Sequence, residues 1–238
     1  MLSGWLMAEK AKSKSGSGCL GKLLFLTILS VVLGLCAAMF LIVQPQDLAD
    51  IGGYGPSAKP LPVRDMKMVL KNSIDRGYPV TLTETEINQW LGRTLSMKQG
   101  GFLADQVSLK RVWVRLEDGV AEIIMEREIA GHPFTVSMFL QIRQVEGPSG
   151  MHTEILLHGG PYQESLPRPM RGGRFGRLVV PQGFLRLVMP AYQKLAAVFK
   201  DEIELGFQEM ARIKIEKNRL ILNPREPSDS NSGIPGTF

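Results

Sequence analysis

The chain's densest group of side chains suited to binding a charged ligand is a set of arginines in its second half. No acidic residue lies between Glu164 and Lys200. Guanidinium groups bind the phosphates of lipid headgroups and the carboxylates of acidic proteins. The set, on a loop that its glycines are expected to make mobile, therefore predicts a contact for anionic lipid or an acidic partner, with a solvated surface loop as the open alternative. Its members are Arg168, Arg171, Arg174 and Arg177, followed by Arg186.

Catalytic and metal-binding motifs give no lead. His152 and His158, on one face of an expected strand, are six residues or roughly 20 Å apart, too far to share a metal ion. The glycine pattern from Gly16 to Gly21 precedes an apolar run, whereas a phosphate-binding loop joins a strand to a helix. The sequence contains neither His-Glu-x-x-His nor Gly-x-Ser-x-Gly. We therefore expect no enzyme activity, no metal and no cofactor.

An uncharged run from Leu23 to Val43 is the strongest signal in the chain. As a helix, its length is roughly 30 Å, the thickness of the hydrocarbon layer of a bilayer. Four lysines and one acid precede it, whereas Asp47 and Asp50 follow it and the next base is Lys59. The positive-inside rule then places the N-terminus in the cytoplasm and the rest of the chain outside it.

A retained anchor explains this run better than a cleaved signal does. The run is longer than the 7–15 apolar residues typical of a signal peptide, and no small-x-small cleavage site ends it. A lipoprotein signal is also disfavoured, because Cys36 follows Leu35 and Cys19 precedes the run. The chain beyond residue 43 has no cysteine, which permits an oxidising compartment. With 28 bases against 23 acids and an excess of three bases in the tail, the remainder carries only +2, which argues against nucleic-acid binding.

Composition divides the chain into five parts. Residues 1–22 form a basic cytoplasmic tail and residues 23–43 a transmembrane helix. Residues 44–63 are rich in proline and glycine, which predicts a linker too poor in apolar groups to pack. Residues 64–223 form one α+β domain, and residues 224–238 a disordered tail.

Within the domain, the pattern predicts two helices and then strands. Residues 64–76 form the first helix, and Thr83-Glu-Thr-Glu86 is a capping box that begins the second. Residues 112–157 alternate in polarity and turn at Asp118-Gly119, which predicts an antiparallel meander with one buried face. Residues 213–222 form a closing hairpin.

The longest apolar stripe follows Pro190 and predicts one helix of about 20 residues. A curved antiparallel sheet packed on this long C-terminal amphipathic helix is the simplest way to cover it. The space between them is either ordinary packed core or a groove that admits a lipid chain. The candidate groove residues are Met138, Leu140, Tyr192, Leu195, Phe199, Ile203 and Phe207.

The order of these pieces resembles the YpmS-like family of membrane-anchored extracytoplasmic proteins. The resemblance covers most of residues 78–223 and is more remote to tubular lipid-binding domains. It implies a bacterial inner (plasma) membrane and a domain able to accept an acyl chain. The matching segments are Leu82-Thr-Glu-Thr-Glu-Ile-Asn-Gln-Trp-Leu, Leu116-Glu-Asp-Gly, Gly131-His-Pro-Phe-Thr-Val-Ser-Met, Leu166-Pro-Arg-Pro and Ile213-Lys-Ile-Glu-Lys-Asn-Arg-Leu.

Two functions fit these features. One is a single-pass envelope protein of uncharacterised activity that binds a lipid or amphipathic ligand in an apolar groove. The other is a structural or interaction module of the envelope, with a fully packed core and a protein partner. An open cavity in the structure would favour the first.

Overall fold

The computed structural model describes residues 18–55, 62, 64–98, 109–129, 131–147, 150–157, 171–208 and 210–224. The chain divides into two compact units, residues 1–40 and residues 41–238, and each is described by itself. The first unit contains most of helix α1, Gly18–Val43, whose last three residues belong to the second unit. Residues Leu20–Val43 have a mean hydropathy of 2.8, and none of the helix is buried. The helix is long and apolar enough to cross a membrane, and a signal sequence would meet the same two criteria.

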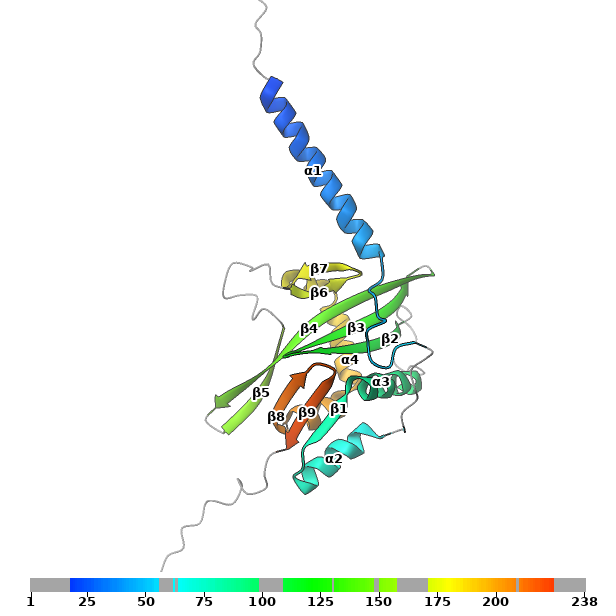
Figure 1. Cartoon of the computed structure of the whole chain (residues 1–238), viewed down its shortest axis with the longest axis vertical. Coiled ribbons are helices and arrows are strands. Elements are labelled where there is room, and N and C mark those ends of the chain that lie inside the picture. Colours follow the sequence, from blue (N-terminus) through cyan, green and yellow to red (C-terminus); the bar gives the residue numbers. More distant parts are fainter. Residues whose placement is uncertain are drawn as a thin grey trace, which may run out of the picture. The chain divides into compact units, whose positions relative to one another are not determined.

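The second unit is an α+β domain with two antiparallel sheets, as the sequence predicts (Figure 1). The larger sheet has the strand order β2-β3-β4-β6-β7, with β5 also paired to β4, and the smaller has the order β1-β9-β8. The strands are β1 Val80–Thr83, β2 Leu109–Glu117, β3 Val120–Ile129, β4 His132–Gly147, β5 Gly150–Leu157, β6 Arg171–Phe175, β7 Leu178–Pro181, β8 Met210–Glu216 and β9 Arg219–Pro224. The helices are α2 Met66–Arg76, α3 Glu84–Lys98, the 3-10 helix η1 Gln182–Leu187, α4 Met189–Val198 and α5 Lys200–Gln208.

Both predicted N-terminal helices of the domain are confirmed, and side chains cap them. Asp65 Oδ1 accepts hydrogen bonds from the first amides of α2, and Gly77 ends that helix with φ +67°. At α3, Glu86 Oε2 accepts from Thr83 N and Glu86 N donates to Thr83 Oγ1, which is the predicted capping box. Burial acts to raise the pKa of Glu86, but the bonds from Thr83 and Arg64 outweigh it and the pKa is lowered.

The predicted meander and closing hairpin are also confirmed. Strands β2 and β3 pair up to Glu117 and Val120, and Gly119 has φ +77°, as a tight Asp-Gly turn requires. Strand β4 pairs with β3 on one side and with β5 on the other. Strands β8 and β9 form the closing hairpin, and β9 also pairs with β1, a short strand that the sequence pattern missed.

The arginine segment forms a hairpin where a mobile loop was expected. Strands β6 and β7 pair with each other, and β6 extends the large sheet beside β4. A side chain at Gly173 would collide with the carbonyl oxygen of Ser137, and one at Gly172 with the backbone of Gln182. These glycines therefore allow close backbone approach and do not indicate mobility.

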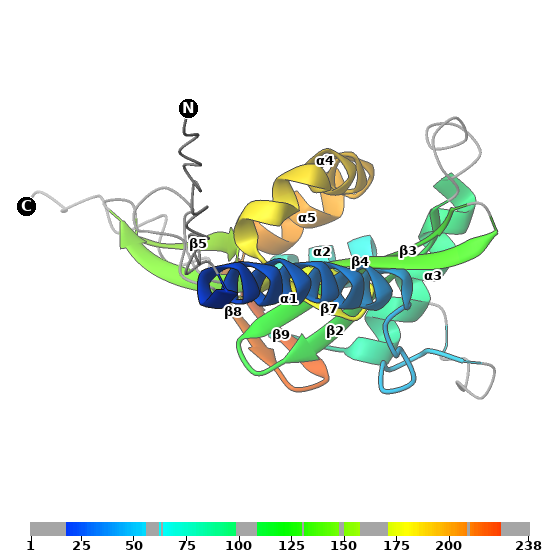
Figure 2. The same ribbon diagram turned by 90° about the horizontal axis from the view of Figure 1, so that it is seen from above.

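The single long C-terminal helix was a wrong prediction, because two helices take its place. The break lies at Phe199, whose amide donates to Ala196 O and whose φ of −108° departs from helical geometry. The Phe199 ring packs against Trp90, with 5.2 Å between centroids. Helix α5 begins at Lys200, and its first turn contains Asp201 and Glu202, whose negative charge is favourable at a helix N-terminus. Figure 2 shows α4 and α5 together on one side of strands β3 and β4.

The opposite face of the large sheet is covered by the segment that follows α1. We call residues 45–54 the exit strap. Leu48 and Ile51 are 5% and 3% exposed, and they form a second apolar cluster with Trp113 and Ile124. The expectation that this proline- and glycine-rich segment cannot pack is therefore wrong, and so is the expectation of one buried sheet face. Figure 1 shows the strap in light blue across β2 and β3.

Two buried polar side chains of α3 fasten the end of the strap. Glu84 accepts from Gly52 N and from Leu116 N, both at 2.6 Å. Asn88 donates to Gly52 O and to Val114 O and accepts from Val114 N, at 2.9, 2.8 and 2.7 Å. The capped start of α3 thus joins the strap to the edge strand β2.

Replacing Asn88 tests this junction. Asn88→Ala leaves three buried backbone groups without partners, so we expect the free energy of unfolding to fall by about 2–4 kcal/mol. Chemical denaturation of the purified chain measures it. Asn72→Ala, at an exposed position of α2, is the control and should change stability by less than about 0.5 kcal/mol. Equal losses in the two variants would show that Asn88 does not hold the strap.

Candidate functional site

The inner face of the large sheet borders an apolar cavity of about 410 Å³. Every element from α2 to β9 contributes to its wall except β6, β7 and η1. Among the described residues of the wall, Glu202 is the one that is charged, and Tyr192 supplies a hydroxyl. The cavity is partly open to the surface and lies within the range of roughly 300–1,000 Å³ typical of small-molecule sites.

The structure brings together six of the seven candidate groove residues. They come from β4, α4, the break between the two helices, and α5: Met138, Leu140, Tyr192, Leu195, Phe199 and Ile203. The side chain of Phe207 lies outside the described residues. The break at Phe199 lets two short helices contribute to the same wall.

The hydroxyl group of Tyr192, a residue of the cavity wall, is hydrogen-bonded to the backbone of the sheet. Its hydroxyl lies 2.9 Å from Ile123 O and 3.0 Å from Val136 O and donates to these carbonyls. Burial raises the pKa of Tyr192, and the negative charge of Glu122 adds to the effect. The phenol therefore stays protonated and acts as a hydrogen-bond donor within the core.

A second groove, with charged residues in its wall, shares lining residues with the apolar cavity. Ile142, Ile213 and Ile215 line both the groove and the cavity. Hydrogen bonds from Lys214 and Arg219 hold the pKa of Glu216 below its ordinary value, despite opposition from desolvation. The charged residues of the groove are Asp118, Lys214, Glu216, Lys217 and Arg219. An amphipathic molecule could thus place its apolar part among the isoleucines and its polar end in the groove.

The apolar wall limits what the cavity can bind by hydrogen bonds. Because the cavity is partly open, water that enters it meets a wall with few polar groups. An ordered water needs two to four polar partners, which this wall does not offer along most of its surface. Covering this wall with an apolar group would remove apolar surface from water, which is favourable.

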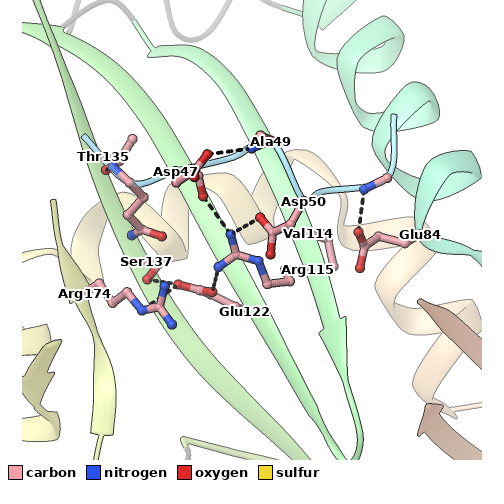
Figure 3. A network of polar contacts seen from close by, with 12 residues as sticks. Asp47, Ala49, Asp50, Glu84, Val114, Arg115, Glu122, Thr135, Ser137 and Arg174 are labelled. Atoms are coloured by element: carbon pink, nitrogen blue, oxygen red, sulfur yellow. Dashed lines mark hydrogen bonds and ion pairs between the residues drawn. The ribbon is translucent and has the colours of Figure 1, made fainter. Parts of the chain in front are cut away.

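The outer face of the same strands carries a buried ionic network (Figure 3). Glu122, 1% exposed, accepts from Arg115 Nη1 at 2.6 Å and from Ser137 Oγ at 2.5 Å. Arg115 Nη2 donates to Asp47 O and to Asp50 Oδ1, at 2.9 and 2.8 Å. Figure 3 shows the Arg115 guanidinium between Glu122 and Asp50. The network ties the exit strap to the middle of the sheet.

The structure describes the side chains of two of the four candidate arginines, Arg174 and Arg177, and these two have different surroundings. Arg168 lies outside the described residues, and only the backbone of Arg171, in β6, lies within them. Arg174 turns toward the sheet, with Nε 3.7 Å from Glu122 Oε1 and its guanidinium over the Phe139 ring. Arg177 is exposed and lies in the turn between β6 and β7. Of the two, Arg177 is therefore the arginine whose side chain is accessible to an external partner.

Sequence reasoning missed Arg115, Glu122 and the strap. Arg115 and Glu122 face each other across the β2–β3 hairpin in the pairing that follows from the Asp118-Gly119 turn. That register was available from the turn, but nothing in the local pattern shows that the strap covers the pair. Among the residues that the structure describes, no group of three metal-ligating side chains occurs.

Comparison with known protein families finds no matching family model, and no curated protein sequence gives a significant match. The geometry of the cavity and the network is therefore the basis for a functional assignment.

Removing one partner of the buried ion pair tests the network. Arg115→Met leaves the Glu122 carboxylate buried without its close countercharge, and we expect stability to fall by about 3–5 kcal/mol. Arg219→Met, which breaks the exposed pair with Glu216, is the control and should cost less than about 1 kcal/mol. Denaturant titration of both variants measures the difference. Similar small losses would contradict a structural role for the pair.

Proposed function

We propose that this chain is a single-pass membrane protein whose extracytoplasmic domain binds a ligand with one hydrocarbon chain. The observation that carries the proposal is the cavity of about 410 Å³ with an almost wholly apolar wall. An apolar cavity of about 150 Å³ holds benzene, so by proportion this one holds roughly 16 carbon atoms. That size fits one acyl chain and is too small for two.

The adjoining groove supports an amphipathic ligand over a plain hydrocarbon. Its three bases and two acids lie next to the isoleucines shared with the cavity. Glu216 already pairs with Lys214 and Arg219, and Asp118 accepts from the Lys217 amide. An anionic end group, such as a carboxylate or phosphate, fits this setting better than a cationic one. The alternative of an interaction module with a fully packed core is less well supported, because of the cavity.

The retained anchor rests on two supports. The apolar helix is flanked by four lysines on its N-terminal side and by aspartates beyond it, which favours a cytoplasmic N-terminus. The last turn of α1 also belongs to the compact unit of the domain, and Arg177 N donates to Leu41 O. A helix end integrated in this way suits a permanent anchor better than a signal that is removed.

Gly206 offers a way to close the cavity without damaging the fold. It lies in α5 in the cavity wall, and a Cβ placed there meets no atom within 4 Å. Gly206→Leu would project into the cavity and raise helix propensity by up to about 1 kcal/mol. We expect binding of a single-chain ligand to fall at least tenfold while stability is kept or raised.

Photo-crosslinking in membranes measures this. Membranes with the full chain are incubated with a photoactivatable 16-carbon fatty acid, irradiated, and analysed by peptide mass spectrometry, with labelling of α1 as the internal standard. Gly92→Leu is the matched control, because Gly92 is a helical glycine outside the cavity wall with equal free space. Loss of labelling on β4 and α4 in Gly206→Leu alone supports the proposal. No labelling of these elements in the parent chain, or equal labelling in all three chains, would overturn it.

A further inference from the structure

The turn between β6 and β7 packs closely against the last residues of α1 and the residue that follows the helix. Arg177 N donates to Leu41 O at 2.9 Å, and Gly176 N donates to Thr135 O at 2.8 Å. A side chain at Gly176 would collide with the carbonyl oxygens of Ile42, Gln44 and Leu41. Gly176 also has φ +54°, which favours glycine. The contact thus depends on this glycine for both space and backbone conformation.

This contact provides a hydrogen-bond donor for a backbone carbonyl at the C-terminal end of α1. The last carbonyls of an α-helix have no partner within the helix, and a membrane offers few donors at its apolar boundary. The turn supplies one amide to Leu41 O and brings the charge of Arg177 to the negative end of the helix dipole. The Arg177 Nε also lies 3.4 Å from Pro45 O. The turn therefore caps the helix from outside its own sequence.

The contact fixes the depth of the turn. Leu41 is two residues, or about 3 Å, before the end of the apolar run at Val43. The hydrocarbon layer ends near Val43 if the run spans it, and the headgroup layer beyond is about 5–8 Å thick on each side. A group bonded to Leu41 and Pro45 lies within that layer.

We infer that the β6–β7 turn rests among the lipid headgroups of the extracytoplasmic surface, with Arg177 bound to lipid phosphate. This inference rests on the retained anchor of the proposed function and does not depend on the cavity. Arg177 is exposed, and a guanidinium donates to a phosphate through two parallel N–H groups. Val179, two residues on and 42% exposed, gives the turn an apolar neighbour at the same boundary. Arg174 takes no part, because it faces Glu122.

Spin labels in lipid nanodiscs test the depth. The full chain, with Cys19 and Cys36 replaced by alanine, carries a nitroxide at Val179→Cys or, as the control, at Met68→Cys in α2, where Met68 is 61% exposed. The discs contain phosphatidylethanolamine, phosphatidylglycerol and a nickel-chelating lipid, whose metal relaxes nearby nitroxides. We expect relaxation at position 179 to be enhanced at least threefold over position 68. Equal relaxation at the two positions would overturn the inference.

Two further variants in the Val179→Cys chain test the contacts. Gly176→Val should displace the turn and lower the enhancement, and Arg177→Ser should lower it at least twofold by removing the phosphate contact. Lys71→Ser removes the same charge from an exposed position of α2 and should leave it unchanged. An unaffected signal in Arg177→Ser would reject the phosphate contact. A chain cleaved before Leu41 and absent from the discs would instead refute the retained anchor itself.

Discussion

The buried pairing of Arg115 with Glu122 is the constraint on which the arrangement of the domain depends. A carboxylate that is 1% exposed is tolerated only with a close countercharge and hydrogen bonds, and Glu122 has both. Arg115 in turn needs acceptors, which the strap supplies through Asp47 and Asp50. The charge on the sheet is therefore satisfied only when the chain that follows α1 lies across it. Leu48 and Ile51 then complete the cover by packing on Trp113 and Ile124.

The two faces of the same strands have different roles. On the outer face, the side chains of Arg115, Glu122 and Ser137 are hydrogen-bonded to one another beneath the strap. On the inner face, residues such as Met138 and Leu140 border open apolar space. Alternation along a strand makes this division possible, because neighbouring residues point to opposite faces. The ionic network on the outer face and the cavity on the inner face therefore use different side chains of the same strands.

Local signals in the sequence were sufficient for much of the fold. The capping box at Thr83, the Asp118-Gly119 turn and the alternation along β4 are each determined by neighbours in the chain, and each is confirmed. The strap, the β6–β7 hairpin and the break at Phe199 depend on contacts between distant segments. Glycines that permit close approach to Ser137 look the same in sequence as glycines of a loose loop. The candidate groove residues were found because alternation along a strand and an apolar stripe along a helix both indicate burial. Neither pattern distinguishes a packed core from the wall of a cavity.

The position of the strap's first contacts limits the distance between the domain and the last residue of α1. Helix α1 ends at Val43, and Gln46 N already donates to Thr135 Oγ1 on β4. Three residues can span only about 10 Å even when fully extended. If α1 is retained in a bilayer as proposed, so short a connection keeps the domain close to the membrane surface, whereas a long unstructured tether would let it move away. A ligand would then reach the domain by lateral diffusion in the bilayer.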